Sequence, residues 1–145
     1  MTVTVDTNVL IYASSAGSPR QPSAMGLLAR LSAGPGLLTF FWPVLLGYVR
    51  IVTNPRIVSP PLSKVEAISS VDSLLARPNA RAVGELDGFW RTFREMAGPV
   101  AARGNLVTDV HIAALMRQHG VREIWTHDRD FRKFDGSVVR DPFAS

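Results

Sequence analysis

The chain has 145 residues, no cysteine, 46% hydrophobic residues and a formal net charge of +4. This length fits one compact domain, expected over residues 1–145, which can bury enough surface to fold without disulfides. The absence of cysteine excludes disulfides, thiolate zinc sites, iron–sulfur clusters and cysteine nucleophiles, and it agrees with a cytoplasmic location.

The first half of the chain alternates strand-like and helix-like segments. In chain order these are a strand over residues 2–5 that ends at Asp6, a helix over 9–13, a loop over 14–22, a helix through 24–31, a strand over 37–41 and a helix from Pro43 to just before Asn54. Asn8 or Thr7 can cap the first of these helices. The apolar stretch 37–49 is broken by a proline and a glycine and is shorter than the roughly 18 residues of a spanning helix, so no membrane segment is predicted.

The second half continues this alternation. Its segments are a proline loop over residues 59–62, a helix from Lys64 to Leu75, a strand over 80–83, a helix over 88–97, a helix from Asn105 or Thr108 to Gly120, a strand over 121–126, a loop over 127–134 and a short candidate strand over 137–139. Ser63 and Glu66 form a capping box, and Asp87 can cap the helix over 88–97. Strands separated by helices predict an α/β domain with a central, mostly parallel sheet of four or five strands flanked by helices.

The three tryptophans lie beside apolar residues that recur at regular spacing. This placement favours burial of Trp42, Trp90 and Trp125 in the core over exposure of their rings for stacking on bases.

Four of the eight aspartates fall where such a fold places a site. Asp6 ends the first strand, Asp109 is expected in the first turn of the helix before the fourth strand, and Asp128 and Asp130 follow that strand. Ligands of open parallel sheets bind beyond the carboxyl ends of the strands. Each aspartate also has an ordinary explanation as a helix cap, a partner of a helix dipole or a turn residue, so their convergence carries the functional interpretation.

Carboxylates that gather at one place need a counter-charge or raised pKa values. Mg²⁺ and Mn²⁺ supply that charge and prefer carboxylate and water oxygens. A cation held this way suits phosphodiester hydrolysis, because it polarises a phosphoryl oxygen and lowers the pKa of a bound water molecule. Other layouts lack support: the sequence has no Walker loop and no GxSxG motif, and His111, His119 and His127 lack the spacing of a zinc site.

Three motifs, in this order, resemble those of PIN-domain nucleases, particularly the VapC toxins of bacterial toxin–antitoxin pairs. They are VTVDTNVL at residues 3–10, NLVTDVHIAA at 105–114 and WTHDRDF at 125–131, followed by a tail with Phe134 and VRDP at 139–142. The resemblance implies that the catalytic acids are Asp6, Asp109, Asp128 and Asp130. It assigns metal contact to the first three, and it implies that Asn8 and Thr126 orient these carboxylates.

The resemblance also implies an activity and partners. The expected activity is Mg²⁺-dependent endoribonuclease cleavage, with Mn²⁺ as a plausible substitute, in which a metal-activated water leaves a 5′-phosphate and a 3′-hydroxyl. The expected partners are an RNA substrate, a small VapB-type antitoxin whose C-terminal segment covers the acidic groove, and a second copy of the chain in a homodimer.

Fourteen of the 16 basic residues are arginine, whose planar fork suits phosphate. A genome rich in arginine codons explains this excess equally well. The candidates for contact with RNA phosphates are Arg50, Arg56, Arg129 and Arg132. For each of them an ordinary solvated surface role is equally compatible with the sequence.

The chain departs from the family pattern at Gly47, where related proteins usually carry a glutamate. No acidic residue lies between Phe40 and Leu62, which removes one negative charge and leaves room for a water molecule or a substrate phosphate. Two alternatives therefore stay open. One is a weakened PIN fold that binds RNA or protein without cutting. The other is a haloacid dehalogenase-like phosphatase with Asp6 as nucleophile, although Asn8 occupies the position of its usual second acid.

Overall fold

Five short strands form one sheet in the computed structural model, which describes residues 1–143. The strands are β1 (Thr2–Val5), β2 (Leu37–Phe41), β3 (Ala80–Val83), β4 (Glu123–Trp125) and β5 (Val138–Arg140). Their order is β3-β2-β1-β4-β5, and all four pairings are parallel. The prediction of a mostly parallel sheet of four or five strands is confirmed. The last two residues of the domain expected over 1–145 lie outside the described residues.

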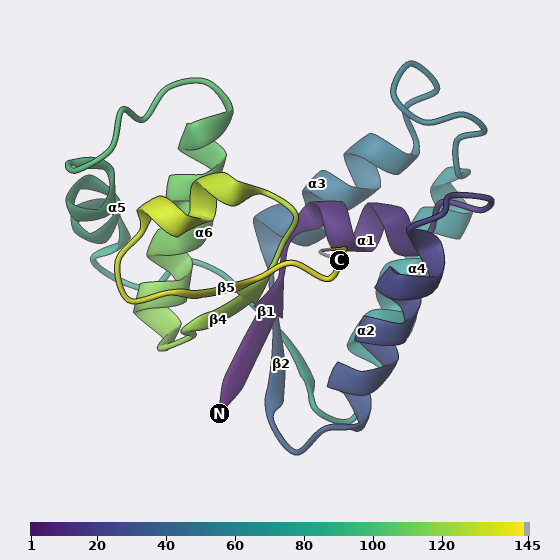
Figure 1. Cartoon of the computed structure of the whole chain (residues 1–145), viewed down its shortest axis with the longest axis horizontal. Coiled ribbons are helices and arrows are strands. Elements are labelled where there is room, and N and C mark those ends of the chain that lie inside the picture. The colour runs from purple at the N-terminus through teal and green to yellow at the C-terminus, as the bar shows by residue number, and fades with distance from the viewer. Residues whose placement is uncertain (144–145) are drawn as a thin grey trace.

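Helices connect these strands, as parallel neighbours require. They are α1 (Thr7–Ala13), α2 (Gln21–Ala33), α3 (Trp42–Val52), α4 (Lys64–Leu75), α5 (Phe89–Ala97), α6 (Asn105–His119) and the short 3₁₀ helix η1 (Arg129–Lys133). Figure 1 shows α1 to α4 on one side of β1, and α5 and α6 on the other. Within residues 1–143 no helix combines the length and apolar character needed to cross a membrane.

The centre of the sheet is buried on both faces. In β1, Val3, Thr4 and Val5 are all buried, and β2 is buried from Leu38 to Phe41. Burial of consecutive residues is typical of parallel strands with helices on both faces. The buried core therefore fixes β1 and the helices that follow it, and with them the end of the strand where Asp6 lies.

Several helix starts differ from the sequence prediction. Of the cap candidates for α1, Asp6 is the cap in place of Asn8 or Thr7, because its extended backbone lets its carboxylate accept a hydrogen bond from the Thr7 amide. Gly88, with φ of 80°, precedes α5 in place of Asp87. The capping box that opens α4 is confirmed.

Several helices expose large apolar side chains. In α4, Val65 and Ile68 are exposed, because this helix packs mainly on α3 and β3 and buries Ala67 and Leu74 instead. Trp42 and Trp90 are likewise exposed, so the expectation of core packing is wrong for both, whereas Trp125 is half-buried. Both rings lie at the start of a helix and fit the regular spacing of apolar residues, but no neighbouring element within residues 1–143 covers them.

The strand order places a switch point beside β1. The chain runs from β1 to β2 on one side of the strand, while β4 lies on its other side. Crevices form beyond the carboxyl ends of the strands at such points, because the connecting helices leave in opposite directions. Asp6 follows β1 and Thr126 follows β4, so both lie at this crevice.

Candidate metal centre and active site

Asp6 is held by the edge of the sheet. Its amide donates to the carbonyl of Trp125 at 2.9 Å, which extends the pairing of β1 and β4 by one residue. Its carboxylate accepts hydrogen bonds from the Thr7 amide at 2.7 Å and from the Thr126 hydroxyl at 2.8 Å. The side chain is therefore fixed in a buried position at the carboxyl end of the central strand.

Thr126 and Asn8 tie the two strand ends together. The Thr126 hydroxyl donates to Asp6 and accepts from the Asn8 amide group at 3.1 Å and from the Asp128 backbone amide at 2.9 Å. The Asn8 side-chain oxygen accepts from the amide of His127 at 3.2 Å. One hydroxyl thus orients a carboxylate, a neighbouring amide and the loop that carries Asp128.

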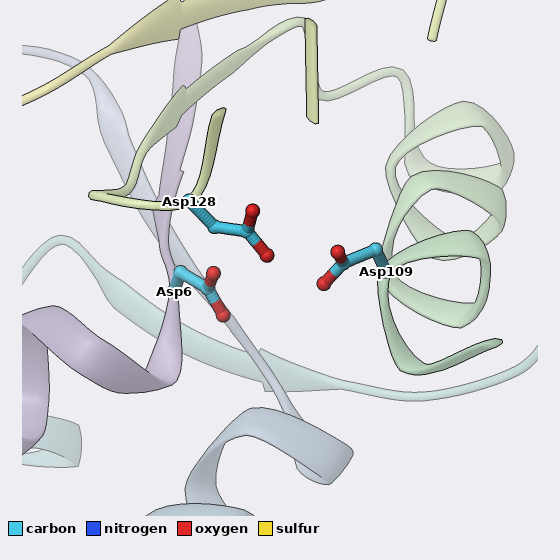
Figure 2. Close-up of side chains that lie close together, drawn as sticks. All are labelled: Asp6, Asp109 and Asp128. Carbon is cyan, nitrogen blue, oxygen red and sulfur yellow. The ribbon is translucent and has the colours of Figure 1, made fainter. Parts of the chain in front are cut away.

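Asp109 faces this group from the opposite wall. It lies in the second turn of α6, not in the first as expected, because the helix begins at Asn105. Figure 2 shows the carboxyl groups of Asp6, Asp109 and Asp128 directed toward one another. One oxygen from each lies within 4.8 Å of the others, which is a spacing that could hold one metal ion. The structure thus brings together three of the four aspartates singled out in the sequence.

The crowding shows in the pKa values of these acids. The pKa of Asp109 is raised to about 8. Burial is the largest cause, and the neighbouring Asp128, Asp6 and Asp130 contribute to the rise because they disfavour a further negative charge. Burial also raises the pKa of Asp6, and the hydrogen bonds from Thr126 and Thr7 oppose that rise. A cation between the carboxylates would reverse both shifts, because it favours the ionised forms.

The fourth predicted acid, Asp130, lies outside this cluster. Its side chain is 52% exposed and forms an ion pair of 3.2 Å with Lys133, while its amide donates to the Asp128 carboxylate. Asp130 therefore lies in the first turn of η1 at the edge of the site, where its charge raises the pKa of Asp109 although it is not part of the cluster of three carboxylates.

The carboxylates lie in an open cleft of about 570 Å³ between α1, α3 and α6. Of the predicted RNA-contacting arginines, Arg50 lines this cleft, whereas Arg56, Arg129 and Arg132 are exposed outside its described lining. Gly47 also lines the cleft, and an added Cβ there would meet only Thr7 at ordinary contact distance. The position that lacks the usual glutamate therefore leaves free space in the cleft wall.

The sequence reasoning missed further residues of this cleft. Asn105 and Thr108 line the cleft together with Asp109. Asn105 precedes Thr108 by three residues and Asp109 by four, a spacing that places side chains on one face of a helix and could have revealed Asn105 in the sequence. His111 lines the rim of the cleft, and its Nε2 lies 2.6 Å from the Glu85 carboxylate. No local pattern signals this pair, because its two residues come from segments far apart in the sequence.

The comparisons with known proteins agree with this arrangement. The PIN domain family model matches residues 3–137. Ribonuclease VapC48 of Mycobacterium tuberculosis is 49% identical over 144 residues, covering 99% of each chain. Ribonuclease VapC43 of the same species is 37% identical over 138 residues, covering 95% of this chain and 93% of its own.

Solved structures show the same fold. A structure of Mycobacterium tuberculosis VapC20, described as a sarcin–ricin loop cleaving toxin, superposes with a TM-score of 0.70 at 20% identity, covering 94% of this chain and 96% of that chain. VapBC2 from Rickettsia felis, bound to a DNA fragment from its promoter, gives a TM-score of 0.65 at 16% identity, with 97% and 98% covered. The chain belongs to the PIN-domain family, and within it to the VapC ribonucleases.

Proposed function

We propose that the protein is a Mg²⁺-dependent endoribonuclease, with Mn²⁺ as a substitute, and the toxin of a VapBC-type toxin–antitoxin pair. The observation that carries this proposal is the group of three carboxylates at the switch point of the sheet. The ribonuclease names of relatives at 49% and 37% identity support the activity.

The donor set fits a hard divalent cation. All three candidate ligands, Asp6, Asp109 and Asp128, offer carboxylate oxygens, which suit Mg²⁺ and Mn²⁺ better than softer metals. The raised pKa of Asp109 is the electrostatic cost of this crowding without a counter-charge. When bound, such a cation supplies Lewis-acid polarisation of a phosphoryl oxygen and lowers the pKa of a water molecule.

Each residue of the site then has its own role in the proposed reaction. Asp6, Asp109 and Asp128 hold the cation, and Asp130 positions water from the edge of the site. Thr126 and Asn8 hold Asp6 and Asp128, the two carboxylates at the ends of β1 and β4, in place. The open cleft admits an extended RNA backbone, whose in-line hydrolysis would leave a 5′-phosphate and a 3′-hydroxyl.

Arginines would bring the anionic substrate to this acidic site. Arg50 lies within the cleft and would contact a phosphate beside the scissile bond. Arg56, Arg129 and Arg132 are exposed and would contact phosphates further along the strand. These contacts would offset the repulsion between the RNA and the carboxylates.

The proposal includes partners and a location. We expect a small VapB-type antitoxin that covers the acidic cleft, and the Rickettsia felis VapBC2 structure provides a related example of such a pair. We also expect a homodimer, and a cytoplasmic location where RNA is accessible. Size measurement of the purified protein, alone and with the product of the neighbouring open reading frame, tests both partners.

Cleavage of labelled RNA tests the activity itself. We expect the purified protein to cut RNA with Mg²⁺ or Mn²⁺ but not with EDTA, and Asp6→Ala to lose on the order of 10²-fold or more in rate. Because Asp6 also caps α1, Asp6→Asn serves as a second variant that keeps a side-chain oxygen for the Thr7 amide. Near-normal cleavage by either folded variant would contradict the assignment of the site.

One observation favours a second candidate, a PIN fold that binds RNA or protein without cutting. Gly47 leaves the cleft with one carboxylate fewer than the family pattern, which weakens cation binding. Calorimetric titration with Mn²⁺ separates the two functions. Absence of binding, together with an unchanged cellular effect of Asp109→Asn, would favour the binding module.

The phosphatase alternative receives no support from the site. It would need an acid at the position of Asn8, whose amide group instead bonds to Thr126 and whose oxygen accepts from His127. Failure to trap a phospho-enzyme with a fluoroberyllate mimic would remove this alternative.

A further inference from the structure

A row of aromatic rings runs from the acidic cleft onto the surface of α5. It begins at His111, which lines the cleft and whose ring centroid lies 5.3 Å from that of Phe89. Phe93 follows at 6.1 Å from Phe89, and Trp90 lies 5.4 Å from Phe93 with the two rings only 9° from parallel. The row thus joins the rim of the cleft to an indole ring that is 66% exposed.

Three rings of the row, Phe89, Trp90 and Phe93, belong to α5, and Phe89 lies against His111 of α6. Elsewhere on α5, Glu95 lies 3.6 Å from Arg117 of α6. With 3.6 residues per turn, the side chain of Trp90 is about 60° from that of Phe93 and about 140° from that of Glu95 around the helix axis. Trp90 therefore projects on the side of Phe93, away from the ion pair between Glu95 and Arg117.

The exposed indole stacks on the ring of Phe93. One of its faces is covered by Phe93, which itself packs against the core, and the other face is open to a ligand. A ring fixed in advance loses little conformational entropy when a flat partner stacks on it. We therefore expect a planar ligand to bind this tryptophan more tightly than a surface tryptophan without a stacked neighbour.

Positive charge surrounds the ring. Arg91 follows Trp90 directly and Arg94 lies one turn later, both are exposed, and within residues 1–143 neither forms an ion pair. Of the acids on and before the helix, Glu95 is engaged by Arg117 and Glu85 by His111, which leaves Asp87 against two free guanidinium groups. This balance favours a polyanion over an apolar protein segment, and the exposed indole ring favours a polyanion that carries flat bases.

We propose that Trp90, backed by Phe93, is a stacking platform for a base of single-stranded RNA that leaves the cleft, with Arg91 and Arg94 contacting the adjacent phosphates. Aromatic rings interleaved with basic side chains bind single strands with little sequence preference, because every base has a flat face. The proposal rests on the proposed endoribonuclease function and adds a substrate-positioning subsite to it.

Binding of RNA without cleavage tests the platform directly. The probe is a fluorescein-labelled oligouridylate of about 12 nucleotides, a length in the range of known single-strand sites, measured in EDTA. We expect Trp90→Ala to weaken binding about tenfold, and Trp90→Phe to keep most of the affinity. Val65→Ala, at an exposed apolar position on α4, is the control and should bind like the original protein.

Abasic probes distinguish stacking from a general surface effect. Removing single bases along the probe should weaken binding of the original protein at the position that meets Trp90, and should cost Trp90→Ala nothing further at that position. Equal losses for both proteins at every position would overturn the proposal, as would unchanged RNA binding by Trp90→Ala. A variant that binds RNA normally but no longer binds a purified antitoxin would show that this surface is a protein interface, which also overturns it.

Cleavage assays with Mg²⁺ separate this proposal from the proposed function. If the platform is correct, Trp90→Ala raises KM about tenfold on single-stranded RNA with little change in kcat. Trp90-dependent RNA binding without any cleavage would contradict the nuclease but support the platform. Cleavage with an unchanged KM in Trp90→Ala would contradict the platform alone. Because Trp90 is exposed, circular dichroism melting should show that the variant folds normally.

Discussion

The two walls of the acidic cleft hold their carboxylates in different ways. On the sheet wall, Asp6 accepts hydrogen bonds from Thr7 and Thr126. On the helix wall, Asp109 is equally buried, but within residues 1–143 no hydrogen bond that would stabilise its ionised form reaches its side chain. Their exposed fractions are similar, 7% and 6%, and their hydrogen bonds differ.

The carboxylate of Asp6 is therefore already hydrogen-bonded in the fold, whereas that of Asp109 depends on a cation for a stabilising partner. Hydrogen bonds to a carboxylate favour its ionised form and oppose the effect of burial. Asp109 lacks that compensation, and its pKa is raised to about 8, which a positive charge between the carboxylates would lower. We therefore expect the sheet wall to set the geometry and the helix wall to respond to metal.

The largest effect is expected from the helix wall. Asp109→Asn should reduce RNA cleavage on the order of 10²-fold or more, because a neutral amide provides no charge for the cation. Asp72→Asn, at an exposed position in α4, is the matched control and should cleave normally. Substantial activity in folded Asp109→Asn would show that the sheet wall binds the cation without α6.

The next effect concerns the preparation of the sheet wall. Thr126→Val removes the hydroxyl that donates to Asp6 and accepts from the Asp128 amide, so we expect cation affinity to fall about 10–100-fold. Leaving these buried groups without a partner should also lower the free energy of unfolding by about 1–3 kcal/mol. Isothermal titration with Mn²⁺ and denaturant unfolding measure the two quantities.

Thr4→Val is a matched control for this change. Thr4 is also buried, in β1, but its hydroxyl has no hydrogen-bond partner among the described residues. Its replacement should leave cation affinity unchanged and should not destabilise the fold. Equal losses of affinity for both variants would contradict the special role of the Thr126 hydroxyl.

Thermal stability should report cation binding independently of cleavage. At a cation concentration of about 100 times Kd, binding should stabilise the protein by about 2.7 kcal/mol, which is roughly 5–10 °C in Tm for a domain of this size. Asp109→Asn should respond much less to Mn²⁺. A full response in this variant would place the cation outside the cluster of three aspartates.

A pH dependence of stability in EDTA should report the raised pKa of Asp109. The folded pKa of Asp109 is raised to about 8 from an ordinary value of 3.8, so the folded state binds more protons than the unfolded state between these values. Its contribution to stability is complete below the lower value and is lost as pH rises toward the upper one. We expect Tm to fall across this window and Asp109→Asn to flatten the trend. A rising Tm in the same window would contradict the raised pKa.

Much of the fold followed from local sequence patterns. Hydrophobic periodicity located the elements, and the serine–glutamate capping box marked the start of α4 correctly. At α1 the sequence left the cap open, because Asp6, Thr7 and Asn8 are all residues that can cap a helix. Only the pairing of β1 with β4 determined that Asp6 caps α1 while Asn8 turns toward Thr126.

The candidate site was partly visible in the sequence. Asp6, Asp109 and Asp128 were identified because acids at strand ends of a parallel sheet converge. Asp130 belongs to the same motif as Asp128, but the turn into η1 directs it toward Lys133 instead. Sequence alone could not separate these two, because their orientation depends on the Thr126 hydroxyl and the geometry of the loop.

The sequence by itself determined the kind of molecule this is: an α/β chain without cysteine, with apolar strands and with acids placed to hold a hard cation. Those properties depend on residue type and local spacing, which can be read along the chain. The tertiary structure alone decided which carboxylates meet, which of them has a hydrogen-bond donor, and that Trp90 is exposed at the end of a row of rings that begins at the cleft. These properties arise because elements distant in sequence pack together, and no local pattern encodes the position of a partner across the fold.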